Sequence, residues 1–531
     1  MMNEKFEMVA KTFKGLEGVL ADELRALGAE DVTEGIRMVA FNGDKEMLYK
    51  ANFCLRTALR VLKPIYKFRS NNADDLYEQI KLFDWEQVLS VDKTFAIDAT
   101  TFGEEFSHSR FVTYRVKDAI VDFFNERYEK RPSIRVTNPD IRLDVHIAGD
   151  EVTLSLDSSG EPLYKRGWRE AQTDAPINEV LAAGIIKLSG WDGNSNFVDP
   201  MCGSGTFLVE AALIAANINP GVYRKGFAFQ QWADYDEELF DSIYNDDSGE
   251  REFKYKIYGS DINGKAIAIS RANVKSAGVG KMVELELKAI EDYNEAPQAG
   301  VLITNPPYGE RLQVGNIEDL YATLGTKFKH VFRSYNAWVI SVDGPHFNMI
   351  GLRPSEKYDL YNGSLDCELR QYVIFDGKYN EMRERGESIK NENFRASTDR
   401  RSLQRREFRE TFSRDERSDR PRRDFGDRPR RNEGDGDRRF NDRPRGDRSF
   451  DRRDDRRSGR ERRFNDRQFS DRPRGERKDD RHGGFSRFRG PQLGADKEVT
   501  IVHGRRKSWM RRDVNESDVR TSNASENENK D

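Results

Sequence analysis

The sequence predicts an α/β protein whose catalytic part contains a mostly parallel sheet covered by helices. Three observations support this fold class. From about residue 165 to 376, strand-like apolar segments alternate with helical segments, which is typical of a parallel sheet with helices on both faces. Residues 1–160 mix short strands and helices in the manner of small α+β modules. Beyond about residue 380 aliphatic residues become scarce, which predicts a disordered tail.

Residues 1–60 are expected to form one small module. A short apolar strand is predicted near Phe6–Ala10. A helix follows, because apolar side chains recur with a period near 3.6 and the pattern then stops at a glycine: Leu16, Val19, Leu20, Leu24, Leu27 and Gly28.

Residues 61–160 are expected to form a second module. Phe95–Thr100 alternates as a half-buried strand, and Val116–Tyr128 has helical spacing. Ile141–Ile147 and Val152–Leu156 are expected as two strands joined by a tight turn. This mixture again indicates an α+β unit.

Residues 161–380 are expected to form the catalytic domain. Six strands are predicted: Asn196–Asp199, Lys256–Asp261, Val283–Leu287, Val301–Asn305, Ala337–Val342 and Glu368–Phe375. The segments Thr206–Asn217 and Gly264–Ser276 are predicted helices between them. The alternation implies a mostly parallel sheet.

Residues 381–531 are expected to be disordered, because their Arg, Asp, Gly, Asn and Ser residues cannot offset the entropy of ordering. A unit Asp-Arg-Pro-Arg recurs at Asp419, Asp427, Asp442 and Asp471. Such a tail resembles disordered RNA-binding segments, yet its Asp residues neutralise much of the charge, so a solubilising spacer is an equal alternative. Residues 499–511 regain apolar character and are either a short docking motif or an apolar remnant.

Composition excludes several classes of protein. The 531 residues have room for two or three domains, and a net charge of −4 decides nothing about partners. Cys54, Cys202 and Cys367 form no CxxC pair, which argues against a disulfide framework or a zinc site. The chain shows no signal-peptide core and no membrane-spanning run. We therefore expect a soluble, cytoplasmic protein with no membrane partner and no metal.

The strongest functional signal is a glycine-rich turn between a strand and a helix. Glycines there let the backbone pass close to a ligand. Leu208 replaces the third glycine of a dinucleotide fingerprint, which argues against NAD, and the absence of a Gly-Lys-Ser/Thr sequence argues against a phosphate loop. The turn itself contains Asp199, Pro200, Met201, Cys202, Gly203, Ser204, Gly205 and Thr206. Cys202 is expected to be a small packed residue whose backbone matters.

An acid ends the next strand, in the sequence Tyr258-Gly-Ser-Asp261-Ile262. Taken alone, Asp261 would be interpreted as a turn or helix cap. One crossover after the glycine turn, it is better placed to accept hydrogen bonds from ribose hydroxyls.

The turn Asn305-Pro306-Pro307-Tyr308 follows an apolar strand and indicates the reaction. An exocyclic amine is a poor nucleophile because its lone pair is delocalised into the ring. The Asn305 side-chain oxygen and the Pro306 carbonyl could accept its two hydrogens, since proline supplies no N–H of its own. Tyr308 could stack on the base.

Lys165, Arg166 and Arg169 form a basic set on the approach to the catalytic domain. Clustered Lys and Arg side chains commonly contact a nucleic-acid backbone. A solvated surface is the alternative, and the sequence does not decide between them.

These turns together resemble those of Rossmann-like methyltransferases that modify exocyclic nitrogens. The wider chain is similar to bacterial large-subunit rRNA guanine-N2 methyltransferases that carry a THUMP domain, over about residues 5–376. The segments that carry this closer resemblance are Thr12–Glu17, Leu163–Arg169, Ala175–Ile177, Ser189–Trp191 and Ala216–Gly221. Residues 1–60 fit the ferredoxin-like opening of that family, and 61–160 its RNA-binding THUMP module.

The resemblance implies a seven-stranded, Rossmann-like catalytic domain, S-adenosylmethionine as cofactor, and N2-methylguanosine in 23S rRNA as product. Asn305, Pro306, Pro307 and Tyr308 would form the catalytic turn. The residues implied in cofactor binding are Asp199, Pro200, Cys202, Gly203, Gly205, Thr206, Asp261, Ile262 and Asp292.

Two features depart from the family pattern. The chain has the Arg/Asp-rich tail where some relatives carry a second methyltransferase domain, so that second activity should be absent. The acidic pair Glu291-Asp292 also matches the family pattern only loosely.

Alternative substrates are a tRNA guanine, the N6 amine of DNA adenine, or a protein glutamine. A different class, an RNA-binding ribosome-assembly factor, also stays open.

Overall fold

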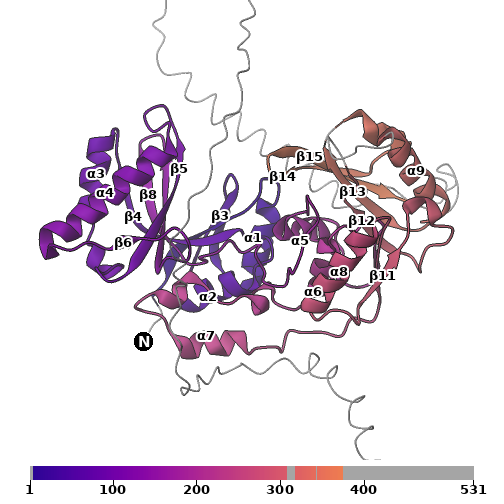
Figure 1. Ribbon diagram of the computed structural model, residues 1–531, viewed down its shortest axis with the longest axis horizontal. Coiled ribbons are helices and arrows are strands. Elements are labelled where there is room, and N and C mark those ends of the chain that lie inside the picture. Colours follow the sequence, from indigo (N-terminus) through magenta and orange to yellow (C-terminus); the bar gives the residue numbers. More distant parts are fainter. Residues whose placement is uncertain (1–3, 308–316, 343, 375–531) are drawn as a thin grey trace, which may run out of the picture. The chain divides into compact units, whose positions relative to one another are not determined.

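A computed structural model describes residues 4–307, 317–342 and 344–374. The described residues build two β-sheets with helices packed on them (Figure 1). No helix among the described residues is both long and apolar enough to cross a membrane.

The first sheet has eight strands in the order β2-β3-β1-β4-β8-β7-β5-β6. Strand β4 pairs antiparallel with β1 on one side and with β8 on the other. The expected boundary near residue 60 therefore separates strands of one continuous sheet. The strands are β1 Phe6–Lys11, β2 Glu30–Glu34, β3 Met38–Gly43, β4 Arg60–Arg69, β5 Thr94–Phe102, β6 Ser133–Ile134, β7 Ile141–Ala148 and β8 Glu151–Asp157.

Helices α1 (Glu17–Leu27), α2 (Lys45–Cys54), α3 (Ala73–Leu82) and α4 (Ser109–Tyr128) accompany this sheet. The end of α1 follows from its sequence, because Gly28 adopts φ 90° as the left-handed C-cap. Helix α2 begins after Asp44, whose carboxylate accepts a hydrogen bond from the Met47 amide.

The second sheet has seven strands in the order β11-β10-β9-β12-β13-β15-β14. Its strands are β9 Asn196–Asp199, β10 Ile257–Asp261, β11 Val283–Leu287, β12 Gly300–Thr304, β13 Asn336–Val342, β14 Glu356–Asn362 and β15 Leu365–Val373. Strands β9 to β13 pair in parallel, and β15 runs antiparallel to β13 and β14. The α/β fold class is confirmed. Strand β14 was not predicted. It lies at the edge of the sheet, and its many polar residues do not show the alternation of apolar and polar side chains that is typical of a half-buried strand.

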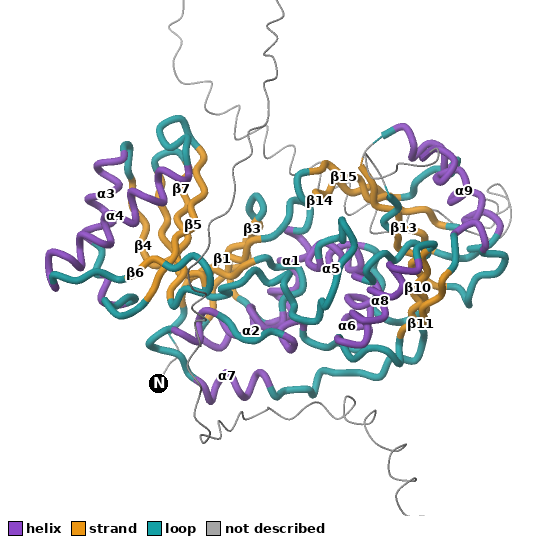
Figure 2. The backbone as a smooth tube through the Cα atoms, viewed as in Figure 1, coloured by secondary structure: helices purple, strands orange, loops and turns teal. Residues whose placement is uncertain are grey.

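Helices cover both faces of the second sheet (Figure 2). Along β9, Phe197 packs into the core under α5 (Glu179–Leu188), α6 (Thr206–Ala215) and α8 (Gly264–Ser276). The next residue, Val198, packs into the core under α9 (Ile317–His330). Successive strand residues point to opposite faces, so a buried parallel strand needs apolar residues at both.

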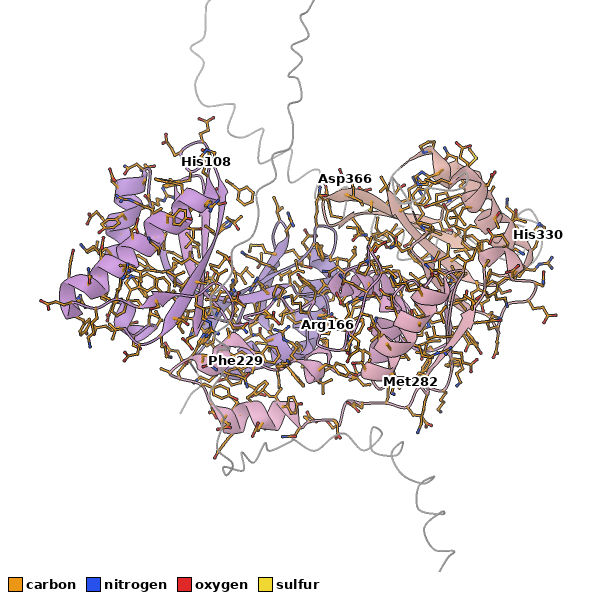
Figure 3. The ribbon with its side chains drawn as sticks, in the orientation of Figure 1. His108, Arg166, Phe229, Met282, His330 and Asp366 are labelled. Carbon is orange, nitrogen blue, oxygen red and sulfur yellow. The ribbon has the colours of Figure 1, made fainter. Side chains whose placement is uncertain are left out.

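Residues 220–244 lie within the catalytic part of the sequence, but they pack on the core of the first sheet. They contain the short helices η2 (Pro220–Tyr223) and η3 (Ala228–Gln231) and helix α7 (Glu237–Tyr244). The Phe229 ring, labelled in Figure 3, stacks on Tyr49 of α2 with 4.4 Å between centroids. Phe240 of α7 meets Phe53 of α2 edge to face. Aromatic side chains from residues 227–240 are thus part of the hydrophobic core beside the eight-stranded sheet.

Candidate active site

The site lies where the strand order of the second sheet reverses. From β9 the chain moves outward through β10 to β11, and it then returns to the other side of β9 as β12. The carboxyl ends of these parallel strands lie at one edge of the sheet, and the gap between β9 and β12 is the usual ligand position in such folds. Asp199 ends β9 and Asn305 directly follows β12.

Asp199 is a buried carboxyl held between these two strands. Its Oδ1 accepts hydrogen bonds from the Thr304 hydroxyl at 2.9 Å and from the Met201 amide at 3.2 Å. Burial raises the pKa of Asp199 to about 7, and these two hydrogen bonds oppose the shift. The residue therefore joins β9, β12 and the glycine turn at one point.

The glycine turn has the backbone that its sequence requires. Gly203 and Gly205 adopt φ +53° and +78°, values that favour glycine. A Cβ on Gly205 would lie 3.0 Å from the Ser270 hydroxyl oxygen, whereas one on Gly203 would meet only Thr173 Oγ1, at 3.9 Å. The turn is therefore packed against α8 at Gly205 and open at Gly203, where a ligand can approach the backbone.

Helix α8 braces the turn with two polar side chains. Ser270 donates from its hydroxyl to the Gly203 carbonyl at 2.7 Å, and Asn273 Nδ2 donates to the Ser204 carbonyl at 2.9 Å. Asn273 also donates to the Ala171 carbonyl at 2.9 Å and accepts from the Glu170 amide at 2.8 Å. Sequence reasoning missed both residues. The signal was two polar side chains three positions apart on one helix face, consistent with a shared buried partner.

The other expected residues of the turn contribute mainly through the backbone. The Cys202 amide donates to the Ser260 carbonyl at 2.9 Å, and the Pro200 carbonyl accepts from the Ser260 hydroxyl at 3.2 Å. Burial raises the pKa of the Cys202 thiol well above its ordinary value, so it is a packed thiol and not a thiolate. Thr206 begins α6, and its hydroxyl accepts a hydrogen bond from Arg169 at 2.9 Å.

Asp261 connects the end of β10 to the turn. Its Oδ2 accepts from the Gly203 amide at 3.0 Å, and its Oδ1 accepts from the Asn263 amide at 2.8 Å. The next side chain, Ile262, is 76% exposed. An acid followed by an exposed apolar side chain can bind the ribose hydroxyls and the base of a nucleoside on one surface.

Glu291 and Asp292 lie in the short helix η4 (Ile290–Asp292) after β11, and both are exposed. Lys327 of α9 donates to the carbonyls on either side of Asp292, those of Glu291 at 2.7 Å and Tyr293 at 2.8 Å. This fixes the backbone of the segment. The choice between the two acids as adenine contact stays a prediction.

Asn305 presents an oxygen without a partner. Its side-chain Oδ1 is buried, and among the residues that the structure describes no donor pairs with it. A buried acceptor left unpaired costs about 1–3 kcal/mol, so a ligand that supplies an N–H would remove this cost. Pro306 is buried and Pro307 partly buried beside it. Tyr308 lies outside the described residues.

The basic set divides into three different environments. Both alternatives for the basic set, an RNA contact and a solvated surface, placed Arg166 (Figure 3) at the surface, and this is wrong: it is 2% exposed and forms an ion pair with Glu210 of α6 at 3.3 Å. Arg169 is partly buried and contacts Glu179 at 2.7 Å and the Ser204 and Thr206 hydroxyls at 3.1 and 2.9 Å. Lys165 is exposed and paired with Glu161 at 3.0 Å. Sequence spacing could not separate them, because burial of Arg166 depends on residues far away in the chain.

Within residues 4–307, 317–342 and 344–374, no group of three or more His, Cys, Asp or Glu side chains is arranged to hold a metal ion.

Three family models match the chain in succession. Residues 7–62 match an RlmL ferredoxin-like domain, residues 70–157 match a THUMP domain, and residues 166–371 match an RMKL-like methyltransferase domain.

Known proteins match over the same stretch. A ribosomal RNA large subunit methyltransferase K/L of Syntrophotalea carbinolica is 40% identical over 391 residues, which cover 71% of this chain and 55% of that protein. The chain thus spans about half the length of the K/L methyltransferases that it matches. A Synechocystis protein named "Putative RNA methyltransferase" is 38% identical over 369 residues, covering 69% of this chain and 96% of its own.

A solved structure shares the architecture. A protein crystallised in complex with SAH (S-adenosylhomocysteine) is 32% identical and superposes with a TM-score of 0.64, covering 71% of this chain and all of that one. Fold, order of modules and sequence identity agree over the described residues. The chain therefore belongs to the family of RMKL-like methyltransferases that carry a THUMP domain.

Proposed function

We propose that this chain is an S-adenosylmethionine-dependent methyltransferase that acts on an exocyclic base amine of RNA. One observation carries the proposal: the buried Oδ1 of Asn305, directly after β12, has no partner among the described residues and follows the Thr304 hydroxyl that binds Asp199. An acceptor held in this way beside a nucleoside-binding turn is suited to an amine donor.

The residues present fit the proposed cofactor. The turn is open at Gly203, where a Cβ would meet only one atom within 4 Å, at 3.9 Å. Asp261 and the exposed Ile262 are suited to a ribose and an adenine, and Asp199 with the turn backbone would hold the methionine end. When bound, S-adenosylmethionine supplies an electrophilic methyl group. The SAH complex of the related solved structure supports this assignment.

Asn305 and Pro306 would bind and orient the amine that is methylated. The Asn305 oxygen and the Pro306 carbonyl accept the two amine hydrogens, which directs the nitrogen lone pair out of the ring plane. The two prolines restrict the backbone of this turn, so the Pro306 carbonyl needs little reorganisation as charge develops. The chemistry is positioning and dipole stabilisation, without a covalent intermediate.

RNA is the substrate class that the relatives support. The K/L relatives carry ribosomal RNA in their names, and residues 70–157 match a THUMP domain. We extend the proposal to 23S rRNA as the RNA and to guanine N2 as the amine. A soluble protein in the cytoplasm, where rRNA is modified, would fit this role.

The test is mass-spectrometric nucleoside mapping of 23S rRNA from cells with and without the gene. Loss of one N2-methylguanosine, restored by the wild type but not by Asn305→Ala, is the expected result. In vitro, Asn305→Ala should lower kcat by about 10²–10³-fold, the usual effect of removing one positioned dipole. Binding of SAH should be unchanged, which shows that the variant is folded.

Asn245→Ala is the matched control. Asn245 follows α7, is exposed, and uses its side chain only to donate to the Asp241 carbonyl at 2.8 Å among the contacts of the described chain. It should restore the modified nucleoside. If every rRNA methylation is unchanged without the gene, the rRNA assignment is wrong and other amines or an assembly role must be tested.

A further inference from the structure

A large groove lies apart from the catalytic turn. Its volume is about 1350 Å³, and its two main walls are residues 159–169, which lead into the catalytic domain, and residues 223–231. Residues between 172 and 179 also line it, together with Phe13, Arg142 of β7 and Asn362 at the turn between β14 and β15. We call this the linker groove. Asp199, Asp261 and Asn305 do not line it.

The walls of the linker groove are fixed against each other. Gly167 adopts φ +106°, and a Cβ there would lie 2.2 Å from the Tyr223 carbonyl oxygen, so only glycine permits this approach. Arg224 then crosses from one wall to the other. Its guanidinium donates to the carbonyls of Ser159 at 3.2 Å, Glu161 at 2.8 Å, Pro162 at 3.0 Å and Lys165 at 2.9 Å. The groove is therefore preformed.

The groove carries an excess of positive charge. Six cationic side chains and two carboxylates line it: Arg142, Lys165, Arg166, Arg169, Arg224 and Lys225, with Glu161 and Glu179. Four of the cations have carboxylate partners, namely Asp98, Glu161, Glu210 and Glu179.

Two cations remain. No ion pair joins Arg224 or Lys225 to a carboxylate within residues 4–307, 317–342 and 344–374. Burial lowers the pKa of Arg224 to about 10, which leaves it charged at neutral pH. Glu161 and Asp157 act on this charge only from beyond ion-pair distance, and Lys225 is exposed beside it.

The groove also contains aromatic rings and adjoins the glycine turn. Tyr164 and Phe13 line the groove and are partly exposed. Arg169 also lines it and contacts Ser204 and Thr206 of the glycine turn at 3.1 and 2.9 Å. A preformed cationic groove with accessible rings, adjoining the cofactor turn, has the features of a site for single-stranded nucleic acid.

We propose that the linker groove binds the backbone of the RNA strand next to the target nucleotide, with Lys225 contacting a phosphate and Tyr164 stacking on a base. This inference rests on the proposed function, since it assumes an RNA substrate. It assigns the RNA contact to residues between the modules, in addition to the THUMP domain.

The first test separates RNA affinity from catalysis. With in vitro transcribed 23S rRNA, Lys225→Glu should raise KM for RNA about 3- to 10-fold and leave kcat and KM for S-adenosylmethionine unchanged. Lys225→Arg should restore KM. Lys254→Glu is the matched control, because Lys254 is exposed and does not line the groove. Equal KM values for Lys225→Glu and Lys254→Glu would overturn the proposal.

The second test does not need methylation. Because residues 381–531 also contain many Arg side chains, the position of contact is mapped directly in the full chain. Ultraviolet cross-linking to a uniformly labelled 23S rRNA transcript should place nucleotides on peptides containing Tyr164. Cross-links elsewhere only would overturn the groove assignment.

The two proposals fail separately. Methylation without cross-links in the groove keeps the proposed function and overturns the groove. Cross-links at Tyr164 without methylation keep the groove as an RNA site and overturn the proposed function.

Discussion

At the scale of single residues, the site is built around two side chains that leave neighbouring strands. Asp199 Oδ1 accepts hydrogen bonds from the Thr304 hydroxyl and the Met201 amide. The buried side-chain oxygen of Asn305 lacks a donor among the described residues. In the proposed function, Asp199 organises the site and Asn305 binds the amine of the substrate. Each residue leads to a different measurement, stability for the first and catalysis for the second.

Asp199 should make the stability of the cofactor-free protein depend on pH. Burial raises its pKa from 3.8 to about 7, so the folded protein holds a proton that the unfolded chain releases. The stability from this residue is present below pH 4 and is lost as the pH rises to about 7. Relative to Asp199→Asn, the wild type should lose up to about 1.4 kcal/mol per pH unit in that window.

Thermal or urea unfolding of both proteins between pH 5 and 7.5 measures this difference. Asp192→Asn serves as control, because Asp192 is exposed. Its difference from the wild type should not change with pH. A constant difference for Asp199→Asn as well would show that Asp199 ionises as an ordinary carboxyl.

Asp261 should control cofactor affinity. Its carboxylate fixes the Gly203 amide at 3.0 Å and keeps lone pairs for ribose hydroxyls. We expect Asp261→Ala to raise the Kd for SAH about 10- to 100-fold, since hydrogen bonds to charged groups contribute about 1.5–3 kcal/mol. Isothermal titration calorimetry measures this value. An unchanged Kd would place the ribose elsewhere.

At the scale of elements, the glycine turn is held from two sides. Helix α8 contributes Ser270 and Asn273, and the linker contributes Arg169, which reaches Ser204 and Thr206. A rigid support of this kind keeps the turn backbone in a conformation that the turn alone would not retain. The shape of the cofactor site therefore depends on α8 and on the linker as much as on the glycines.

Two glycines allow a matched test of this support. Gly205 and Gly190 have similar φ values, +78° and +74°. A Cβ on Gly205 would lie 3.0 Å from Ser270 Oγ, whereas nothing lies within 4 Å of one on Gly190. Both alanine variants should lose about 1 kcal/mol to backbone strain. Only Gly205→Ala should also weaken SAH binding, by about tenfold or more, because the turn must move.

The melting temperatures of the Gly205→Ala and Gly190→Ala variants and their calorimetric affinities for SAH test this prediction. Equal SAH affinities would show that the contact between Gly205 and α8 does not shape the cofactor site.

At the scale of the whole described chain, Arg166 forms a buried ion pair within the catalytic domain and a hydrogen bond to residues 1–60. Arg166 pairs with Glu210 of α6 at 3.3 Å and donates to the Arg56 carbonyl at 2.6 Å. Arg56 in turn donates to the Ile218 carbonyl at 2.8 Å. Burial raises the pKa of Glu210, and Arg166 opposes that shift. These contacts join residues that are distant in sequence across the two cores.

Breaking this pair should be costly. Arg166→Met leaves Glu210 buried without its partner and should lower stability by about 3–5 kcal/mol. The double variant Arg166→Met/Glu210→Leu should recover much of that loss, because neither member of the pair then remains as a buried charge without the other. Lys165→Met, at the neighbouring exposed pair with Glu161, should change stability by less than about 1 kcal/mol. Unfolding monitored by circular dichroism measures all three, and a single-variant loss as small as that of Lys165→Met would contradict the buried role.

The sequence by itself determined the fold class and the family. Alternating apolar segments predicted the parallel sheet, because buried strands and amphipathic helices have different periods, and the glycine turn, Asp261 and Asn305 all lie at strand ends where the pattern placed them. These features are local, so a short stretch of chain is enough to encode them.

The tertiary structure decided what depends on distant partners. It placed β4 in a sheet shared by both modules, paired β14 at the sheet edge, and packed residues 220–244 on the first core. It also buried Arg166 against Glu210 and turned Ser270 and Asn273 toward the glycine turn. Burial and partner choice are set by residues far away in the chain, and no local pattern carries that information.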